Sequence, residues 1–306
     1  MRVAAIDCGT NSVRLLVAEA GDEGRLVDLD RRLILTRLGQ GVDATGRFHP
    51  DALARTLDAF AEYADVIAQL GVGRVRLVAT SAARDASNRD EFFAGARERL
   101  GIDAEIISGD EEAALSFRGA LTALPDVAAP ALVMDIGGGS TELVLGSGGA
   151  TPHIEHGLSL DIGSVRIRER FLAGDPPTAE QIAAASDYVD SLLDGSGIPF
   201  ARVATWIGVG GTATSLSAVN QRLPEYDRTK VHASTITRHD LSALTRRLLG
   251  SSVAQVRELP SMHPKRADVI CAGALIADRV GRRVGVDLTV SESDILDGIA
   301  LGLLER

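Results

Sequence analysis

The sequence has 306 residues, of which 45% are apolar and only 4% aromatic, and its formal net charge is −10 at pH 7. This composition excludes a disordered chain and predicts cores built from aliphatic side chains. The negative charge argues against nucleic acid as a partner, because a basic surface supplies most of that affinity. No run approaches the roughly 18 apolar residues of a membrane span, so we expect no membrane partner. With two cysteines and no recognisable leader, we expect a cytoplasmic protein without a disulfide framework.

The first part of the chain reads as three strands joined by polar turns, followed by alternating helices and strands. Apolar runs between Gly-rich or Asn-rich turns predict the strands, which are 3–7, 13–20, 26–35, 75–79 and 104–107. Apolar residues at helical spacing predict helices at 50–70, 90–100 and 111–121. An antiparallel start followed by strand–helix alternation is typical of a mixed sheet covered by helices.

After a proline-containing segment at 124–130, which we interpret as a hinge, the opening pattern repeats. Three positions of the two halves coincide: Asp7 with Asp135, Gly9 with Gly137, and Ser12 with Ser140. Each half therefore begins with a hairpin whose tip reads Asp-x-Gly-x-x-Ser, and the copies are about one domain length apart. This repeat predicts two α/β domains of related fold, 1–126 and 127–306, each with its own hairpin.

The remainder is predicted to be mostly helical. The expected helices are 178–193, 238–249, 266–280 and 295–304, and one further strand, 203–208, leads into the turn Gly210-Gly211-Thr212. The last helix is amphipathic, so in a two-domain protein it has an apolar face to bury. Periodicity leaves open whether this helix packs on the first domain or on the second.

The two hairpin tips have the composition of anion-binding loops. Glycines allow backbone N–H groups to approach a phosphate closely, and hydroxyl and amide side chains add donors. The residues concerned are Gly9, Thr10, Asn11 and Ser12 in the first tip, and Gly137, Gly138, Gly139, Ser140 and Thr141 in the second. The aspartate before each tip, Asp7 or Asp135, is a candidate ligand of a divalent cation. A single such loop is often only a turn, whereas two in register are much stronger evidence of a phosphate site.

These motifs resemble those of the Ppx/GppA phosphatases, a family of exopolyphosphatases and guanosine pentaphosphate phosphohydrolases within the actin, sugar-kinase and heat-shock ATPase superfamily. The similar stretches are Asp7-Cys8-Gly9-Thr10-Asn11-Ser12-Val13-Arg14, residues 80–88, residues 107–113, residues 135–142, Gly208-Val209-Gly210-Gly211-Thr212 and residues 266–270. They span nearly the whole chain, whose length resembles that of the short, two-domain members. The resemblance implies two ribonuclease-H-like (actin-like ATPase) domains, each with a mixed five-stranded sheet flanked by helices, and an active-site cleft between the domains.

The resemblance also implies roles for individual residues. Glu112 matches the family's general base, which orients and deprotonates the attacking water. Without the resemblance, Glu111 and Glu112 read as acids that favour a helix N-terminus. Asp135 and Glu142 match acidic residues of a metal site, and with Asp7 they imply Mg²⁺ as cofactor, because carboxylates beside a phosphate repel it unless a cation is present. Three arginines fall on arginine positions of the motifs and are expected to bind phosphate: Arg14, Arg84 and Arg266. For Arg266, an ion pair with Asp268 is the alternative.

The expected activity is hydrolysis of the terminal phosphate of inorganic polyphosphate, with release of orthophosphate. Guanosine pentaphosphate is the alternative substrate, and the sequence does not decide between the two. A second alternative is a kinase or nucleotide-dependent ATPase of the same superfamily, with a nucleoside site near residues 210–214. A third is a non-catalytic alarmone-binding or self-assembling protein. The resemblance is the only ground for expecting a homodimer.

Overall fold

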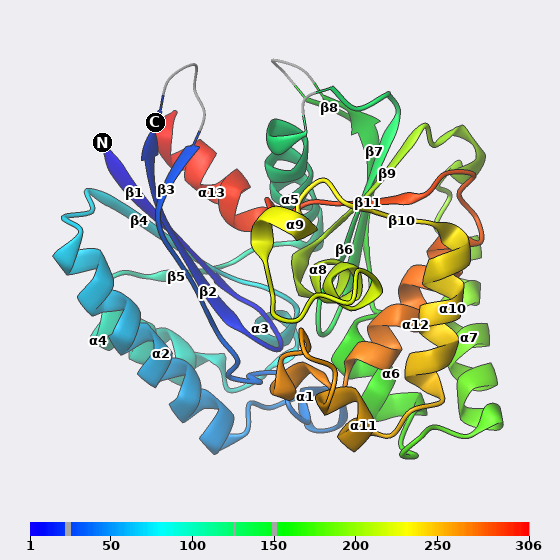
Figure 1. Ribbon diagram of the computed structural model, residues 1–306. Helices are drawn as coiled ribbons and strands as arrows, with labels where there is room; N and C mark the ends of the chain where they lie inside the picture. Colours follow the sequence, from blue (N-terminus) through cyan, green and yellow to red (C-terminus); the bar gives the residue numbers. More distant parts are fainter. Residues whose placement is uncertain (22–25, 125, 149–151, 306) are drawn as a thin grey trace. The chain divides into compact units, whose positions relative to one another are not determined.

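The computed structural model describes residues 1–21, 26–124, 126–148 and 152–305, and it divides into two compact units (Figure 1). The first unit comprises Met1–Gly119 and Asp294–Arg306, and the second comprises Ala120–Ser293. This division departs from the expected domains 1–126 and 127–306. The boundary falls inside a helix rather than in the proline-containing segment, and residues from 294 onward belong to the first unit. The last helix therefore packs on the first unit, which periodicity had left open.

The first unit is built on a five-stranded mixed sheet. Its strands are β1 (Arg2–Cys8), β2 (Val13–Ala20), β3 (Leu26–Ile34), β4 (Arg74–Ala79) and β5 (Ala104–Ile106), in the order β3-β2-β1-β4-β5. β1, β2 and β3 pair antiparallel, whereas β4 runs parallel to both β1 and β5. The carboxyl ends of β1, β4 and β5 therefore meet at one edge of the sheet, where ligands bind in open α/β sheets.

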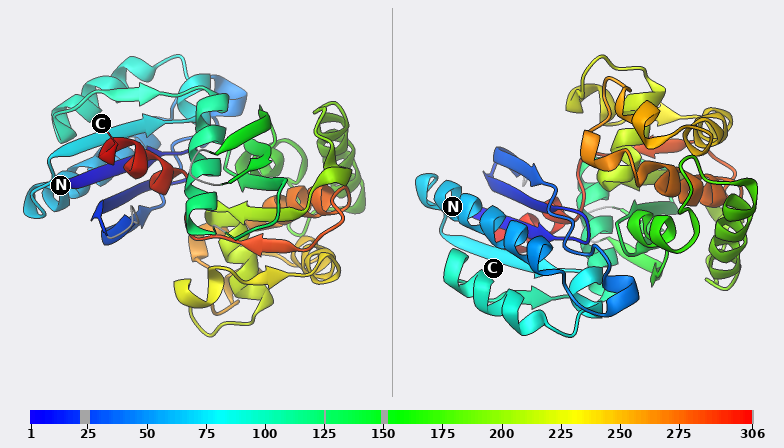
Figure 2. Two further views of the ribbon diagram at one scale, coloured as in Figure 1. Left: turned by 90° about the horizontal axis from the view of Figure 1, so that it is seen from above. Right: turned by 90° about the horizontal axis from the view of Figure 1, so that it is seen from below.

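Both faces of this sheet are covered, because alternate side chains of each strand point to opposite faces. Ala4, Ile6 and Cys8 lie in the core beneath the helices α2 (Pro50–Gln69) and α4 (Arg89–Leu100). Val3 and Ala5 lie in a second core with buried residues of α13 (Ile295–Leu304). Figure 2 shows α13, in red, beside the first strands, in blue. Asp7 continues the register of Val3 and Ala5, so it lies on the face that α13 covers.

Three further helices complete the first unit: α1 (Val42–Thr45), α3 (Ser81–Asp85) and α5 (Gly109–Ala123), whose last residues belong to the second unit. α5 and α13 pack with their backbones in contact. A Cβ atom at Gly119 would collide with the Asp294 carbonyl oxygen, and one at Gly298 would collide with the Leu115 carbonyl oxygen. Only glycine allows so close an approach of two helices.

The second unit has a six-stranded sheet in the order β10-β11-β9-β6-β7-β8. Its strands are β6 (Ala131–Ile136), β7 (Thr141–Ser147), β8 (His153–Leu160), β9 (Thr205–Val209), β10 (Thr235–Ile236) and β11 (Leu288–Val290). The order β8-β7-β6-β9-β11 repeats that of the first unit, which confirms the predicted architecture of two related mixed sheets. The expected number of strands was wrong for this sheet, because the two-residue β10 extends it beyond β11.

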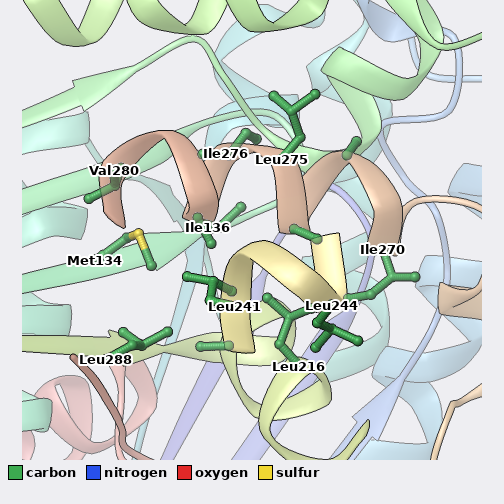
Figure 3. Packing of buried hydrophobic residues seen from close by; sticks show 14 of the residues in the cluster. Met134, Ile136, Leu216, Leu241, Leu244, Ile270, Leu275, Ile276, Val280 and Leu288 are labelled. Atoms are coloured by element: carbon green, nitrogen blue, oxygen red, sulfur yellow. The ribbon is translucent and has the colours of Figure 1, made fainter. Parts of the chain in front are cut away.

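Helices cover the second sheet and form the largest core (Figure 3). They are α6 (Ser164–Phe171), α7 (Ala179–Asp194), α8 (Gly210–Asn220), α9 (Arg228–Val231), α10 (Arg238–Leu249), α11 (Val253–Arg257) and α12 (Ile270–Gly281), with 3-10 turns at Phe200–Arg202 and Pro264–Arg266. Leu244 of α10 lies near Ile270 of α12, and Leu241 of α10 lies near Ile136 of β6. Within the described residues, no helix combines the length and the apolar composition that a membrane span requires.

Candidate active site

The first hairpin tip is held by the segment that follows β3. Gly9 N–H donates to the Ser12 carbonyl oxygen at 2.9 Å and closes the turn. The carbonyl oxygens of Thr10 and Asn11 accept from Gly39 N–H at 2.8 Å and from Arg37 N–H at 3.0 Å. In a planar trans peptide, the C=O and the following N–H point in opposite directions. The N–H groups of Asn11 and Ser12 are therefore turned away from residues 37–39, as in an anion-binding nest.

The second tip repeats this arrangement with a different support. Its turn closes through Gly137 N–H and the Ser140 carbonyl oxygen, at 3.0 Å. The loop carbonyls then accept from the start of α6: Gly137 from Ser164 N–H at 2.9 Å and Gly138 from Arg166 N–H at 3.1 Å. A Cβ atom at Gly163 would collide with Gly138. The N–H groups of Gly138 and Gly139 are thus turned away from α6, as in an anion-binding nest.

Asp7 and Arg14 face each other across β1 and β2. Arg14 donates from Nη2 and Nε to Asp7 Oδ2, at 2.7 and 3.0 Å, and from Nη1 to Asp294 Oδ2 at the start of α13. Burial raises the pKa of Asp7 above its ordinary value, against the opposing effect of Arg14. Asp7 Oδ1 is buried and has no hydrogen-bond partner among the described residues. Arg14 therefore orients Asp7 in addition to the phosphate-binding role expected of it.

Arg84 and Glu112 follow the two neighbouring strands β4 and β5, so the parallel register brings them together. Arg84 Nη1 donates to Glu112 Oε2 at 2.8 Å and to the Ile107 carbonyl oxygen at 3.1 Å. Glu112 is buried, whereas Glu111 is exposed and pairs with Arg76 at 2.7 Å. An ion pair with a guanidinium is made by an ionised carboxylate, which is the form that a general base needs. Glu112 is thus buried and Glu111 exposed, which agrees with the expectation that Glu111 is a surface residue.

Asp135 and Glu142 are direct partners across β6 and β7, so their carboxylates share one face of the sheet. Both are buried, and Ser159 Oγ of β8 donates to Glu142 Oε1 at 2.7 Å. Asp135 also lies against the turn after β9: a Cβ atom at Gly210, whose φ is +73°, would be 2.5 Å from Asp135 Oδ1. Two buried acids side by side are unfavourable unless a cation or a proton accompanies them.

The third glycine-rich turn lies between Asp135 and Arg266. A Cβ atom at Gly211 would overlap the Arg266 guanidinium, so this side chain rests directly on the turn. Near Arg266, Tyr226 donates to Glu292. Arg266 therefore adds positive charge at the carboxyl edge of the second sheet, on the same unit as Asp135 and Glu142.

Cys8 precedes the first tip but is no candidate nucleophile. Its side chain is buried under α2 and α4, and burial, followed by the charge of Asp7, raises the pKa of the thiol well above its ordinary value. A buried neutral thiol behaves as a small apolar side chain.

Each unit thus gathers its own set of the predicted residues. Arg84 and Glu112 form one contact, Asp7 and Arg14 a second, and Asp135 and Glu142 a third. Sequence reasoning missed the supporting residues, which are Arg37, Gly39, Ser159, Gly163, Ser164, Arg166 and Asp294. Gly39 follows Gly9 by 30 residues and Gly163 follows Gly137 by 26 residues, so unequal spacing left no sequence signal for these supports.

Two like-ordered mixed sheets, each opening with a glycine-rich hairpin at its carboxyl edge, define a two-unit α/β protein. More specifically, the chain belongs to the Ppx/GppA phosphatase family, whose model matches residues 16–302. It is 48% identical to exopolyphosphatase 2 of Mycobacterium tuberculosis, over 99% of this chain and 98% of that protein. It is 33% identical to a bifunctional 3-dehydroquinate synthase/phosphatase of Fusobacterium nucleatum, over 99% of this chain but 46% of that protein.

Solved structures show the same similarity. A crystal structure of an exopolyphosphatase from Cytophaga hutchinsonii has a TM-score of 0.89 at 27% identity, and the match covers 100% of this chain and 98% of that one. A Ppx/GppA family member from Aquifex aeolicus has a TM-score of 0.84 at 31% identity, with the same coverage. These similarities extend over both units.

Proposed function

We propose that this protein is an exopolyphosphatase that hydrolyses the terminal phosphoanhydride bond of inorganic polyphosphate and releases orthophosphate. The observation that carries this proposal is the pair of hairpin tips, whose carbonyls are tied back so that their N–H groups are turned outward. Terminal phosphates bind to such nests through backbone N–H groups. The names of the family and of its relatives support polyphosphate as the substrate and hydrolysis as the reaction.

Glu112 is the proposed general base. Arg84 fixes its carboxylate through a bond of 2.8 Å, and the pair lies at the carboxyl edge of the first sheet with the first tip. In the proposed reaction, Glu112 accepts a proton from water as the water oxygen attacks the terminal phosphorus, and the shortened chain leaves with the bridging oxygen. Within each unit, the outward N–H groups of its own tip are the proposed ligands of nonbridging phosphate oxygens, where negative charge is spread, and in the second unit Arg266 is a further proposed ligand.

The residues fit a bound Mg²⁺, which is also part of the proposal. No group of three or more His, Cys, Asp or Glu side chains in the described part of the chain is arranged to hold a metal ion alone. Mg²⁺, however, usually takes one or two carboxylates and fills its remaining positions with water and phosphate oxygens. The adjacent Asp135 and Glu142 of the second unit supply such a pair. In the first unit, Asp7 Oδ1, which has no hydrogen-bond partner among the described residues, is a separate oxygen acceptor. When bound, Mg²⁺ supplies positive charge that offsets the phosphate and carboxylate charges.

Guanosine pentaphosphate stays the alternative substrate, because its terminal phosphoanhydride presents the same chemistry to the tips. A cytoplasmic location and a homodimer also belong to this proposal. Hydrolysis of ATP, or phosphoryl transfer to an acceptor, would instead indicate the superfamily's kinase and ATPase activities.

The experiment is to measure orthophosphate release from short and long polyphosphate, guanosine pentaphosphate and ATP, with and without Mg²⁺. The variants are Glu112→Gln and, as a matched control, Glu111→Gln, which removes the neighbouring exposed acid. We expect Mg²⁺-dependent release from polyphosphate, a loss of about 10²- to 10⁴-fold in Glu112→Gln, and little change in Glu111→Gln. An unimpaired Glu112→Gln enzyme would refute the assigned base, and absence of release from every compound would refute the proposed hydrolysis.

A further inference from the structure

The N-terminus of α6 is capped by loop carbonyls instead of by a side chain. The first N–H groups of a helix lack partners within the helix and are commonly capped by a polar side chain. The N-cap of α6 is Gly163, which has no side chain to donate or accept. The N–H groups of Ser164, Val165 and Arg166 instead donate to the carbonyls of Gly137 and Gly138 in the second hairpin tip. The tip and the helix start therefore satisfy each other's hydrogen bonds.

Arg166 completes this arrangement with its side chain. Its Nε donates to the Gly139 carbonyl oxygen at 2.7 Å, and the residue is only 8% exposed. Asp161, itself largely exposed, lies 3.8 Å from Arg166 Nη2. Burying a guanidinium is costly unless it is hydrogen-bonded, and an apolar side chain would fill the same space without that cost. The bond to Gly139 is thus a contact that an apolar residue of similar volume could not make.

We propose that Arg166 is a positioning residue for the second phosphate loop, an inference that rests on the proposed function. By holding the Gly139 carbonyl, Arg166 keeps the Gly139–Ser140 peptide in the orientation that turns the Ser140 N–H toward the bound phosphate. Ser164 and Val165 hold the two preceding carbonyls through their backbone N–H groups, and Ser164 Oγ adds a second bond to the Gly137 carbonyl oxygen at 3.1 Å. Among the described residues, Arg166 is the side chain that bonds the Gly139 carbonyl, so its substitution tests that part of the support.

The chain offers closely matched variants. In Arg166→Gln, the amide nitrogen occupies the same position along the side chain as Nε, so a neutral donor is retained. In Arg166→Met, a methyl group occupies that position, and the donor is lost at similar volume. Arg168→Met is the control, because Arg168 lies on the same helix and donates from Nη1 to the Gly174 carbonyl oxygen at 2.9 Å, away from the loop.

The measurements are kcat/KM for polyphosphate, the dissociation constant of inorganic phosphate, and the thermal midpoint of each variant. We expect Arg166→Met to lower kcat/KM by about 10- to 100-fold and to weaken phosphate binding. Arg166→Gln should restore both values to within a few-fold of wild type, and Arg168→Met should change only the thermal midpoint. This pattern would show that the Nε–H donor of Arg166, rather than its positive charge, positions the loop.

Other patterns overturn the inference. If Arg166→Gln and Arg166→Met lose activity and phosphate binding equally, the charge acts on the substrate directly and the positioning role is wrong. If neither variant loses them, the loop does not depend on Arg166. Should Arg166→Met fail to fold, the folded Arg166→Gln decides by retaining or losing phosphate affinity. A wild-type protein that binds phosphate but releases none from polyphosphate contradicts the proposed function alone, because the phosphate affinities still test the role of Arg166.

Discussion

Buried carboxylates on the α13 face of the first sheet are subject to opposing effects on their pKa values. Asp297 is buried at the first turn of α13, where it pairs with Arg31 at 2.8 Å and accepts from Asp294 N–H at 3.0 Å. Burial raises the pKa of Asp297, Arg31 lowers it, and Asp294 raises it again, with a net upward shift. Asp7 is shifted in the same direction. Keeping Asp7 and Asp297 ionised in these buried positions therefore costs the protein some stability at neutral pH.

This shift predicts the sign of a pH dependence. A raised pKa means that the folded state binds the proton more tightly than the unfolded state does. The contribution of Asp297 is therefore fully present below the ordinary value of 3.8 and is lost as the pH rises through the folded pKa. In Asp297→Asn, we expect the free energy of unfolding to decline less between pH 4 and pH 7 than in wild type. Denaturant unfolding at several pH values measures this difference.

Asp240→Asn is the control for this measurement, because hydrogen bonding from Thr237 lowers the pKa of Asp240 and gives its contribution the opposite sign. That variant should keep the wild-type decline or steepen it. If the free energy of unfolding of wild type and of Asp297→Asn declined equally with pH, Asp297 would not be the source of the decline.

At the scale of elements, the crossing of α5 and α13 provides two glycines in different surroundings on one helix. A Cβ atom at Gly298 would collide with the backbone of α5, whereas one at Gly302 would have only Arg118 Nη1 at 4.0 Å. Gly298→Ala should therefore cost about 1–3 kcal/mol by forcing the helices apart. Gly302→Ala should stabilise the protein by about 0.5–1 kcal/mol through helix propensity. Urea unfolding of both variants compares them, and a stabilising Gly298→Ala would refute the close crossing.

Some predicted elements have the observed bounds. The helix 295–304 and the strand 13–20 do, because each is a mainly apolar run that ends at polar or turn residues. α12 begins at Ile270 rather than at residue 266, since Pro264–Arg266 forms a separate 3-10 turn. α6 was not predicted, because its start is held by loop carbonyls instead of a capping side chain, which leaves no local signal. α8 was read only as a glycine turn, because it is buried on nearly all sides and lacks an apolar stripe.

In the candidate site, too, some residues could be predicted from the sequence and others could not. The residues at the tips, and Glu112, Asp135 and Glu142, were predicted from motifs that are contiguous in sequence. Their supports come from segments that register and helix packing bring to them, such as Arg37 behind the first tip and Asp294 beside Arg14. Such contacts depend on tertiary structure, and no local spacing encodes them. Which side chains support a motif is therefore visible only in the folded protein.

At the scale of the whole molecule, the two units differ in how the chain builds them. The second unit is one continuous segment, Ala120–Ser293, whereas the first needs both Met1–Gly119 and the residues from Asp294 onward. α13 fills one face of the first sheet with Ile295, Leu296, Ile299, Ala300 and Leu303. Removing it would expose the apolar side chains of β1 and β2 to water, at roughly 1.5–3 kcal/mol for each large side chain.

A variant that ends at Ser293 tests this dependence. We expect its amide hydrogens in β1 and β2 to exchange rapidly, while those in β6 and β9 stay protected, because the core of the second unit contains no residue of α13. Hydrogen exchange followed by mass spectrometry measures both regions in one sample. Equal protection of β1 in the shortened and full chains would show that α13 is dispensable for the first sheet.

The return of α13 to the first sheet also sets an order of events during translation. A ribosome releases the residues of β1 first, yet the helix that covers one face of that strand is made only after residues 120–293. At ordinary elongation rates this interval is on the order of ten seconds. The segment synthesised first is thus the last to be completed, and during this interval the nascent chain must shield an aliphatic sheet face from aggregation, either by itself or with a chaperone.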